Sequence, residues 1–127
     1  MLEEKIEDVA VSLLRLAVTI LPRDVEEALK KAMERERNET AKAQLKAIIK
    51  NVQLAEQTGA PICQDTGTIN FYLTAGDKFP ILANLPVILR RATKHATETV
   101  PLRPNAVNPF TGKNSGDNTG KSMPYTH

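Results

Sequence analysis

The feature that most constrains the fold of this chain is a change in residue pattern and composition at Gly59. Before Gly59, apolar residues recur at steps of three and four, the spacing that places them on one face of an α-helix. After it lie all five aromatic residues and seven of the eight prolines. We therefore predict one domain-sized region, residues 1–127, with a helical part at 1–58 and a mixed, site-bearing part at 59–127.

The first part predicts three helices. Pro22 ends the first helix, the second runs from about Asp24 to Arg37, and the third runs from about Glu39 to Gln57, with Gly59 at the C-cap. The second and third are expected to form an antiparallel hairpin around a short break near Asn38. Apolar stripes on these helices are interpreted as core or subunit contacts; on the first helix the stripe consists of Leu2, Ile6, Val9, Leu13, Leu16 and Ile20.

The second part predicts a strand, a helix and a long loop. Residues 68–74 are rich in β-formers and bounded by glycines, and residues 85–99 read as a helix with Pro86 in its first turn. Residues 101–127 have no period, which a disordered tail would also show. They nevertheless keep chemically useful groups, which favours an ordered loop: Arg103, Asn105, Lys113, Asn114, Asp117 and Asn118. The predicted fold class is α+β, with N-terminal helices packed on this strand–helix–loop portion, as a fragment of a larger α/β domain.

Charge and hydropathy exclude several classes of partner. A net charge of +2 from 17 basic and 15 acidic residues is too balanced to predict binding to nucleic acid or to a membrane surface. The chain has no apolar run near the roughly 20 residues that span a bilayer, and its acidic start is unlike a secretory signal. A cytoplasmic location is therefore expected. A single cysteine excludes an internal disulfide.

That cysteine, Cys63, lies in a short predicted loop between a helix and a strand. On chemistry alone a lone cysteine is more often a small buried hydrophobe than a ligand. Its neighbours Gln64, Asp65 and Thr66 are polar, however, and this is an unusual setting for a core residue. One thiolate cannot hold a metal or an iron–sulfur cluster, so the partners of a ligating Cys63 must lie outside this chain.

Two long segments resemble one enzyme family. Residues 63–67, Cys-Gln-Asp-Thr-Gly, resemble the cysteine motif of class I fumarate hydratases and the related L-tartrate dehydratases. Residues 102–109 and 111–120 resemble a second motif of the fumarase branch, and residues 124–127 resemble the strand that follows it. The resemblance is weak over the first half of the chain and strong over residues 60–127. It identifies the chain as the N-terminal part of the α region of an iron–sulfur hydro-lyase.

The resemblance implies a cofactor and roles for four residues. The cofactor is a 4Fe–4S cluster held by three cysteines, of which Cys63 is one and the other two fall beyond residue 127. Gln64 and Asp65 would bind substrate, and Asp65 would also act in catalysis by aligning a proton-transfer group from the β region. Arg103 is the candidate for gripping the distal carboxylate of a dicarboxylate substrate, because a guanidinium binds carboxylates through two hydrogen bonds. The structural alternative for Arg103 is a loop-stabilising salt bridge.

The expected function is a share in the reversible hydration of fumarate to malate. The remaining α sequence and a β region or subunit would complete the site, and the assembly is expected to be an oligomer. Dehydration of L-tartrate is an alternative in the same reaction class, although Arg103-Pro104-Asn105 and residues 111–120 favour the fumarase branch. A second alternative is a non-catalytic module that binds a partner subunit and holds no cluster.

Overall fold

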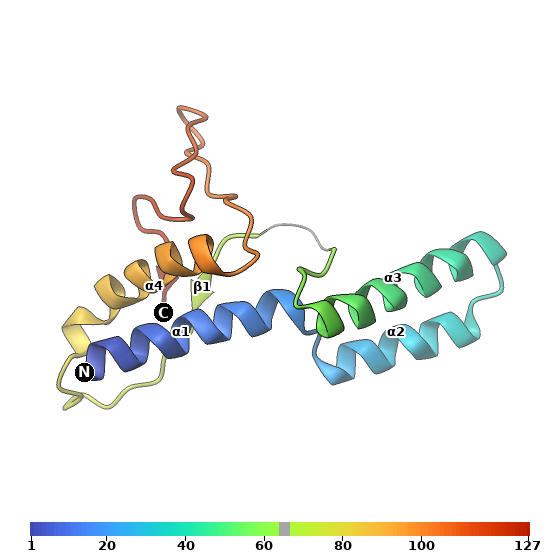
Figure 1. The fold of residues 1–127 in the computed structure, drawn as a ribbon, viewed down its shortest axis with the longest axis horizontal. Helices are drawn as coiled ribbons and strands as arrows, with labels where there is room; N and C mark the ends of the chain where they lie inside the picture. The colour runs from blue at the N-terminus through green and yellow to red at the C-terminus, as the bar shows by residue number, and fades with distance from the viewer. Residues whose placement is uncertain (64–66) are drawn as a thin grey trace. The chain divides into compact units, whose positions relative to one another are not determined.

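The protein is described by a computed structural model that places residues 1–63 and 67–127. It is mostly helical with one small parallel sheet, so the predicted α+β class is confirmed. In chain order the elements are α1 (Leu2–Thr19), α2 (Arg23–Arg35), α3 (Glu39–Thr58), β1 (Asn70–Phe71), a 3-10 turn (Leu82–Asn84), α4 (Leu85–Thr99) and β2 (Tyr125–Thr126) (Figure 1). Among the helices that the structure describes, none has the length and apolar character that crossing a bilayer demands.

The chain divides into two compact units. The first consists of Met1–Arg15 and Thr66–His127, and the second of Leu16–Asp65, so α1 begins in one unit and ends in the other. Each unit has its own small hydrophobic core.

The second unit is built on the α2–α3 hairpin (Figure 1). The Asn38 side chain caps α3 by accepting hydrogen bonds from the backbone N–H groups of Thr40 (3.0 Å) and Ala41 (3.1 Å). Such a cap satisfies donors that the first helical turn leaves without partners. Gly59 ends α3 in the left-handed conformation at φ 66°, which glycine adopts without strain. The predicted hairpin and both predicted ends of α3 are therefore confirmed.

The first unit packs α4 against the N-terminal part of α1. Ala10 of α1 is buried with Leu89 and Ala92 of α4, and Phe71 of β1 packs against them. This small apolar cluster is the core of the first unit.

Polar contacts fix the same pair of helices at its margin. The Arg91 guanidinium donates through Nε to Glu7 Oε2 at 3.0 Å and lies 3.6 Å from Glu3 Oε2. Asn84, just before α4, donates to the other Glu3 oxygen at 3.1 Å. These exposed pairs contribute little free energy each, but they fix how α4 lies along α1 within this unit.

The apolar stripe predicted on the first helix is not its buried face. Ala10 and Leu14 are buried, whereas Leu13 is 56% exposed. The core interpretation of this stripe is wrong for five of its six members: Leu2, Val9, Leu13, Leu16 and Ile20 are all exposed. The other interpretation, a subunit contact, stays a prediction.

The strand predicted over residues 68–74 is present but much shorter. Only Asn70 and Phe71 form β1, in parallel register with Tyr125 and Thr126 of β2. The resemblance placed a strand at residues 124–127, and β2 confirms it.

Candidate functional site

Cys63 sits at the surface on a backbone that is held in place. Its side chain is exposed and its thiol is free. Its N–H donates to Asn51 Oδ1 of α3 at 2.9 Å, and the preceding Ile62 is buried and donates its N–H to the Val18 carbonyl at 2.9 Å. Two consecutive backbone groups are thus anchored while the sulfur faces outward, which suits a ligand for a group supplied from outside this unit.

Gln64 and Asp65, the other two predicted site residues of this loop, lie outside the described residues. Their roles stay predictions. Cys63 belongs to the second unit and Arg103 to the first, so the contacts described for each residue are those within its own unit.

Arg103 lies at the start of the long loop that follows α4, and its side chain is exposed. Its backbone carbonyl accepts a hydrogen bond from Asn118 Nδ2 at 3.0 Å. Within residues 1–63 and 67–127 the guanidinium has no ion-pair or hydrogen-bond partner, so the loop-stabilising salt bridge is absent from this part of the chain. The Arg103 backbone is therefore held in place, and its guanidinium is available to bind a ligand.

Asn118 is the residue that organises this loop, a role that its sequence context indicates only weakly. It is 6% exposed, accepts from the Asn105 N–H at 2.8 Å, and donates to the Arg103 carbonyl and to Thr97 Oγ1 at 3.1 Å. Its φ of 58° lies in the left-handed region, which asparagine tolerates better than most residues. An asparagine within a glycine-rich stretch was the one available signal.

Other loop side chains also bind neighbouring backbone groups. Asn114 Nδ2 donates to the Pro104 carbonyl at 2.6 Å, and its Oδ1 accepts from the Gly116 N–H at 2.7 Å. Asn108 Oδ1 accepts from the N–H groups of Phe110 and Thr111 at the loop tip. These side-chain bonds substitute for regular secondary structure.

The carboxyl group of Asp117 has a lowered pKa. Burial on its own would raise the pKa of this group, but hydrogen bonds from Thr119 and Ser115 and the positive charge of Lys94 lower the pKa below its ordinary value. Asp117 Oδ1 accepts from both the N–H (3.0 Å) and the hydroxyl (2.7 Å) of Thr119. This carboxylate is therefore engaged in holding the turn that contains Asn118.

The described residues contain no cluster of metal-ligating side chains. No group of three histidine, cysteine, aspartate or glutamate side chains gathers anywhere in residues 1–63 and 67–127. An exposed Cys63 on an anchored loop fits the role of one thiolate ligand among several, and it does not form a complete site.

A comparison with protein families gives one match over nearly the whole chain. The family described as fumarate hydratase (Fumerase) matches residues 7–126. This span contains Cys63, Arg103 and both residues of β2.

Individual relatives are named as α subunits of L(+)-tartrate dehydratase. The chain is 43% identical over 123 residues to the Methanocaldococcus jannaschii protein named "Putative L(+)-tartrate dehydratase subunit alpha", which covers 95% of this chain and 43% of that protein. It is 36% identical over 121 residues to the L(+)-tartrate dehydratase subunit alpha of Escherichia coli strain K12, covering 95% of this chain and 40% of that protein. The chain thus spans about two fifths of the length of the curated relatives it matches.

Proposed function

Because the chain belongs to the fumarate hydratase (Fumerase) family, we propose that it supplies part of the active site of an iron–sulfur hydro-lyase, with L-tartrate as the first candidate substrate. The carrying observation is that the relatives are named as tartrate dehydratase α subunits and match 95% of this chain. These names favour the tartrate alternative over the hydration of fumarate, which the loop motif alone had favoured. Fumarate remains the second candidate, since the matching family bears its name.

Cys63 is proposed as one thiolate ligand of a 4Fe–4S cluster. Its exposed sulfur and its backbone, pinned by Asn51, support this role. When bound, such a cluster supplies a Lewis-acidic iron that polarises oxygen atoms of the substrate. The remaining ligands must come from polypeptide outside this chain, since clusters of this type need several thiolates.

Arg103 is proposed as the group that binds the substrate carboxylate farther from the reacting carbon. Its guanidinium has no partner among the described residues, and its backbone carbonyl is held by Asn118. A free guanidinium on a fixed backbone can form two parallel hydrogen bonds to a carboxylate, which orients a dicarboxylate as well as binding it.

Gln64 and Asp65 are proposed, from the resemblance of their motif, to contact substrate beside the cysteine. Asp65 would align the group that moves the proton, and that group would come from a β subunit. A multisubunit assembly follows from the same reasoning, since the relatives are α subunits. The non-catalytic module remains the alternative for the isolated chain, and a cytoplasmic location stays a prediction.

The substrate is tested with the assembled enzyme. This chain, joined to the rest of an α subunit and combined with a β subunit, is reconstituted anaerobically with iron and sulfide. Loss of L-tartrate and loss of malate are then followed separately. We expect tartrate to be the better substrate by kcat/KM. A strong preference for malate and fumarate would move the assignment to fumarate hydratase, and activity on neither would leave the subunit-binding module.

The ligand role of Cys63 is tested by replacing the sulfur alone. In the assembly, Cys63→Ser should lose the cluster, measured as iron per protein and as the visible absorption of the cluster. Arg103→Ala is the matched control, because it removes a proposed substrate contact and should keep full iron content. Iron content in the serine variant equal to that of the unaltered assembly would refute the ligand role.

A further inference from the structure

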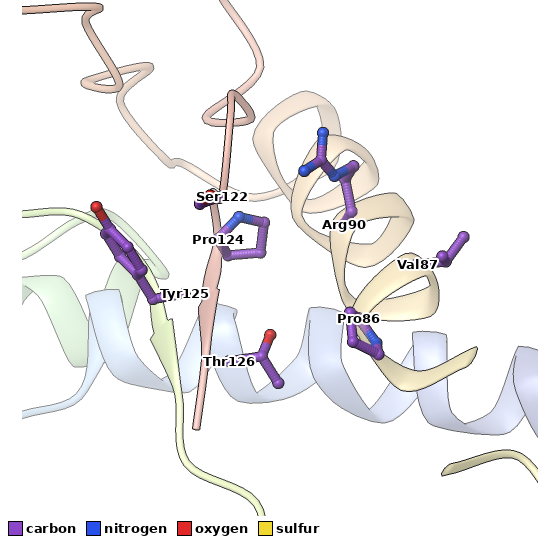
Figure 2. Close-up of a pocket in the computed structure, with 7 residues that line it drawn as sticks. All are labelled: Pro86, Val87, Arg90, Ser122, Pro124, Tyr125 and Thr126. Carbon is purple, nitrogen blue, oxygen red and sulfur yellow. The ribbon is translucent and has the colours of Figure 1, made fainter. Parts of the chain in front are cut away.

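A pocket of about 470 Å³ lies in the first unit between α4 and the C-terminal segment. Three residues of α4 line it on one side and four of the C-terminal segment on the other: Pro86, Val87 and Arg90, and Ser122, Pro124, Tyr125 and Thr126 (Figure 2). None of these residues belongs to the site proposed above. The lining combines apolar carbon, hydroxyl groups and one cation.

The backbone at this pocket presents a free sheet edge. Tyr125 donates its N–H to the Ile69 carbonyl at 3.2 Å, and His127 donates its N–H to the Phe71 carbonyl at 2.8 Å. Because alternate residues of a strand direct their backbone groups to opposite sides, the N–H and C=O of Thr126 point away from β1. Among the described residues these two groups have no partner. Such an edge is a template for another strand.

The pocket also lies on the helix-covered face of the sheet. Phe71 packs on that face against Ala10, Leu89 and Ala92, and Thr126 is its register partner. Register partners in neighbouring strands direct their side chains to the same face. The pocket beside Thr126 is therefore where an inward side chain of a third strand would lie. Two strands of two residues each are also far smaller than the sheets that are stable alone, which have about three or more strands.

Arg90 adds a charge requirement. Its neighbour Arg91 pairs with Glu7 and Glu3, whereas Arg90 has no ion-pair or hydrogen-bond partner in the described parts of the chain. A guanidinium at the margin of an apolar pocket selects a segment that carries a carboxylate.

We propose that an extended segment of the polypeptide that completes the α subunit adds to β2 as a third strand. Its backbone pairs with the N–H and C=O of Thr126, an apolar side chain covers Val87, and a carboxylate side chain meets Arg90. The identity of this partner rests on the proposed function, because the relatives are α subunits and this chain covers only 43% of one and 40% of another. A second copy of the chain fits less well, since residues 121–127 include no acidic side chain to pair with Arg90.

The test measures backbone protection at the edge. The chain is mixed with a separate polypeptide made of the part of the Methanocaldococcus jannaschii relative that the match does not cover. Amide hydrogen exchange is followed residue by residue. The Thr126 N–H should slow by about tenfold or more on mixing, whereas the N–H groups of Tyr125 and His127, already bonded to β1, should change little.

Matched variants separate edge pairing from general damage. Thr126→Pro removes the outward N–H without touching the bonds to β1, and it should abolish binding, whereas Thr126→Val keeps the N–H and should bind normally. Arg90→Ala should weaken binding about tenfold, and Lys94→Ala, which removes a charge from the same helix outside the pocket, should not. Unchanged exchange at Tyr125 and His127 verifies that each variant keeps the sheet.

Several results would overturn the proposal. Binding with no slowing at Thr126 would mean that the partner docks elsewhere, and no binding at all would mean that this edge is not its site. Slowing in the chain alone that grows with concentration would assign the edge to a second copy. Slowing caused by free tartrate or malate would make the pocket a small-molecule site. The assay involves no cluster and no turnover, so its failure is distinct from failure of the proposed reaction.

Discussion

Replacing Asn118 by alanine is expected to open the loop that carries Arg103, because one buried side chain holds three of its anchors. Those anchors are the Asn105 N–H, the Arg103 carbonyl and Thr97 Oγ1. All three hydrogen bonds are lost together in Asn118→Ala, and groups in a partly buried setting are left without partners.

The size of the effect follows from this geometry. Each lost hydrogen bond contributes about 1 kcal/mol to stability, or about 3 kcal/mol for the set. Alanine at a φ of 58° adds a backbone cost of about 1 kcal/mol, which asparagine tolerates better and glycine does not incur. We therefore expect Asn118→Ala to destabilise the closed loop by about 4 kcal/mol, and Asn118→Gly by about 1 kcal/mol less.

A suitable reporter is the Gly116 N–H, whose hydrogen bond goes to Asn114 and not to Asn118. Its amide exchange should accelerate by about 100-fold or more in Asn118→Ala, because each 1.4 kcal/mol corresponds to about tenfold. Asn105→Ala is the matched control. Asn105 contributes only its backbone N–H to this network, so truncating its side chain should leave the exchange of Gly116 nearly unchanged.

A change of less than about threefold at Gly116 in Asn118→Ala would refute this reasoning, since it corresponds to less than about 1 kcal/mol. The loop would then be held by Asn114 and Asp117, which form their own backbone contacts. An equal effect in Asn105→Ala would show that the loop responds to any truncation.

Three further outcomes are expected. In the assembled enzyme, Arg103→Ala should raise the KM for the dicarboxylate by about 10-fold or more with iron content intact. Arg103→Lys should restore the KM only in part, because lysine cannot bind a carboxylate through two parallel hydrogen bonds. An unchanged KM in Arg103→Ala would mean that Arg103 is a structural residue. The pKa of Asp117 is lowered in the folded chain, so its contribution to stability is present above the ordinary aspartate pKa of about 4 and is lost as the pH falls through the lower folded value. In Asp117→Asn, the stability of the loop measured by amide exchange should therefore depend less on pH in the acid range. The same acid dependence in both proteins would contradict the lowered pKa. Asn51→Ala should speed exchange of the Cys63 N–H about fivefold through loss of one hydrogen bond of about 1 kcal/mol, and no change would show that the Val18–Ile62 bond suffices.

Local signals in the sequence predicted the helices well. A helix is specified by residues close together in the chain, so the break near Asn38 and the C-cap glycine Gly59 marked where α3 begins and ends. The motif around Cys63 likewise predicted an exposed thiol on a loop, because polar neighbours and a proline are poor material for a core. The roles of Gln64 and Asp65 stay predictions of that motif.

The tertiary structure decided which apolar residues are buried and where the strand ends. On α1 the more hydrophobic stripe is exposed and Ala10 is buried instead, because burial depends on which face meets Leu89 and Ala92 of α4 and not on apolar character alone. A strand needs a partner, and β1 extends only over the two residues that pair with β2. The three contacts of Asn118 come from residues 13 to 21 positions away, and no local pattern encodes them. Sequence periodicity thus determined the helices of this chain, whereas the buried faces, the sheet and the loop that presents Arg103 depended on contacts between distant residues.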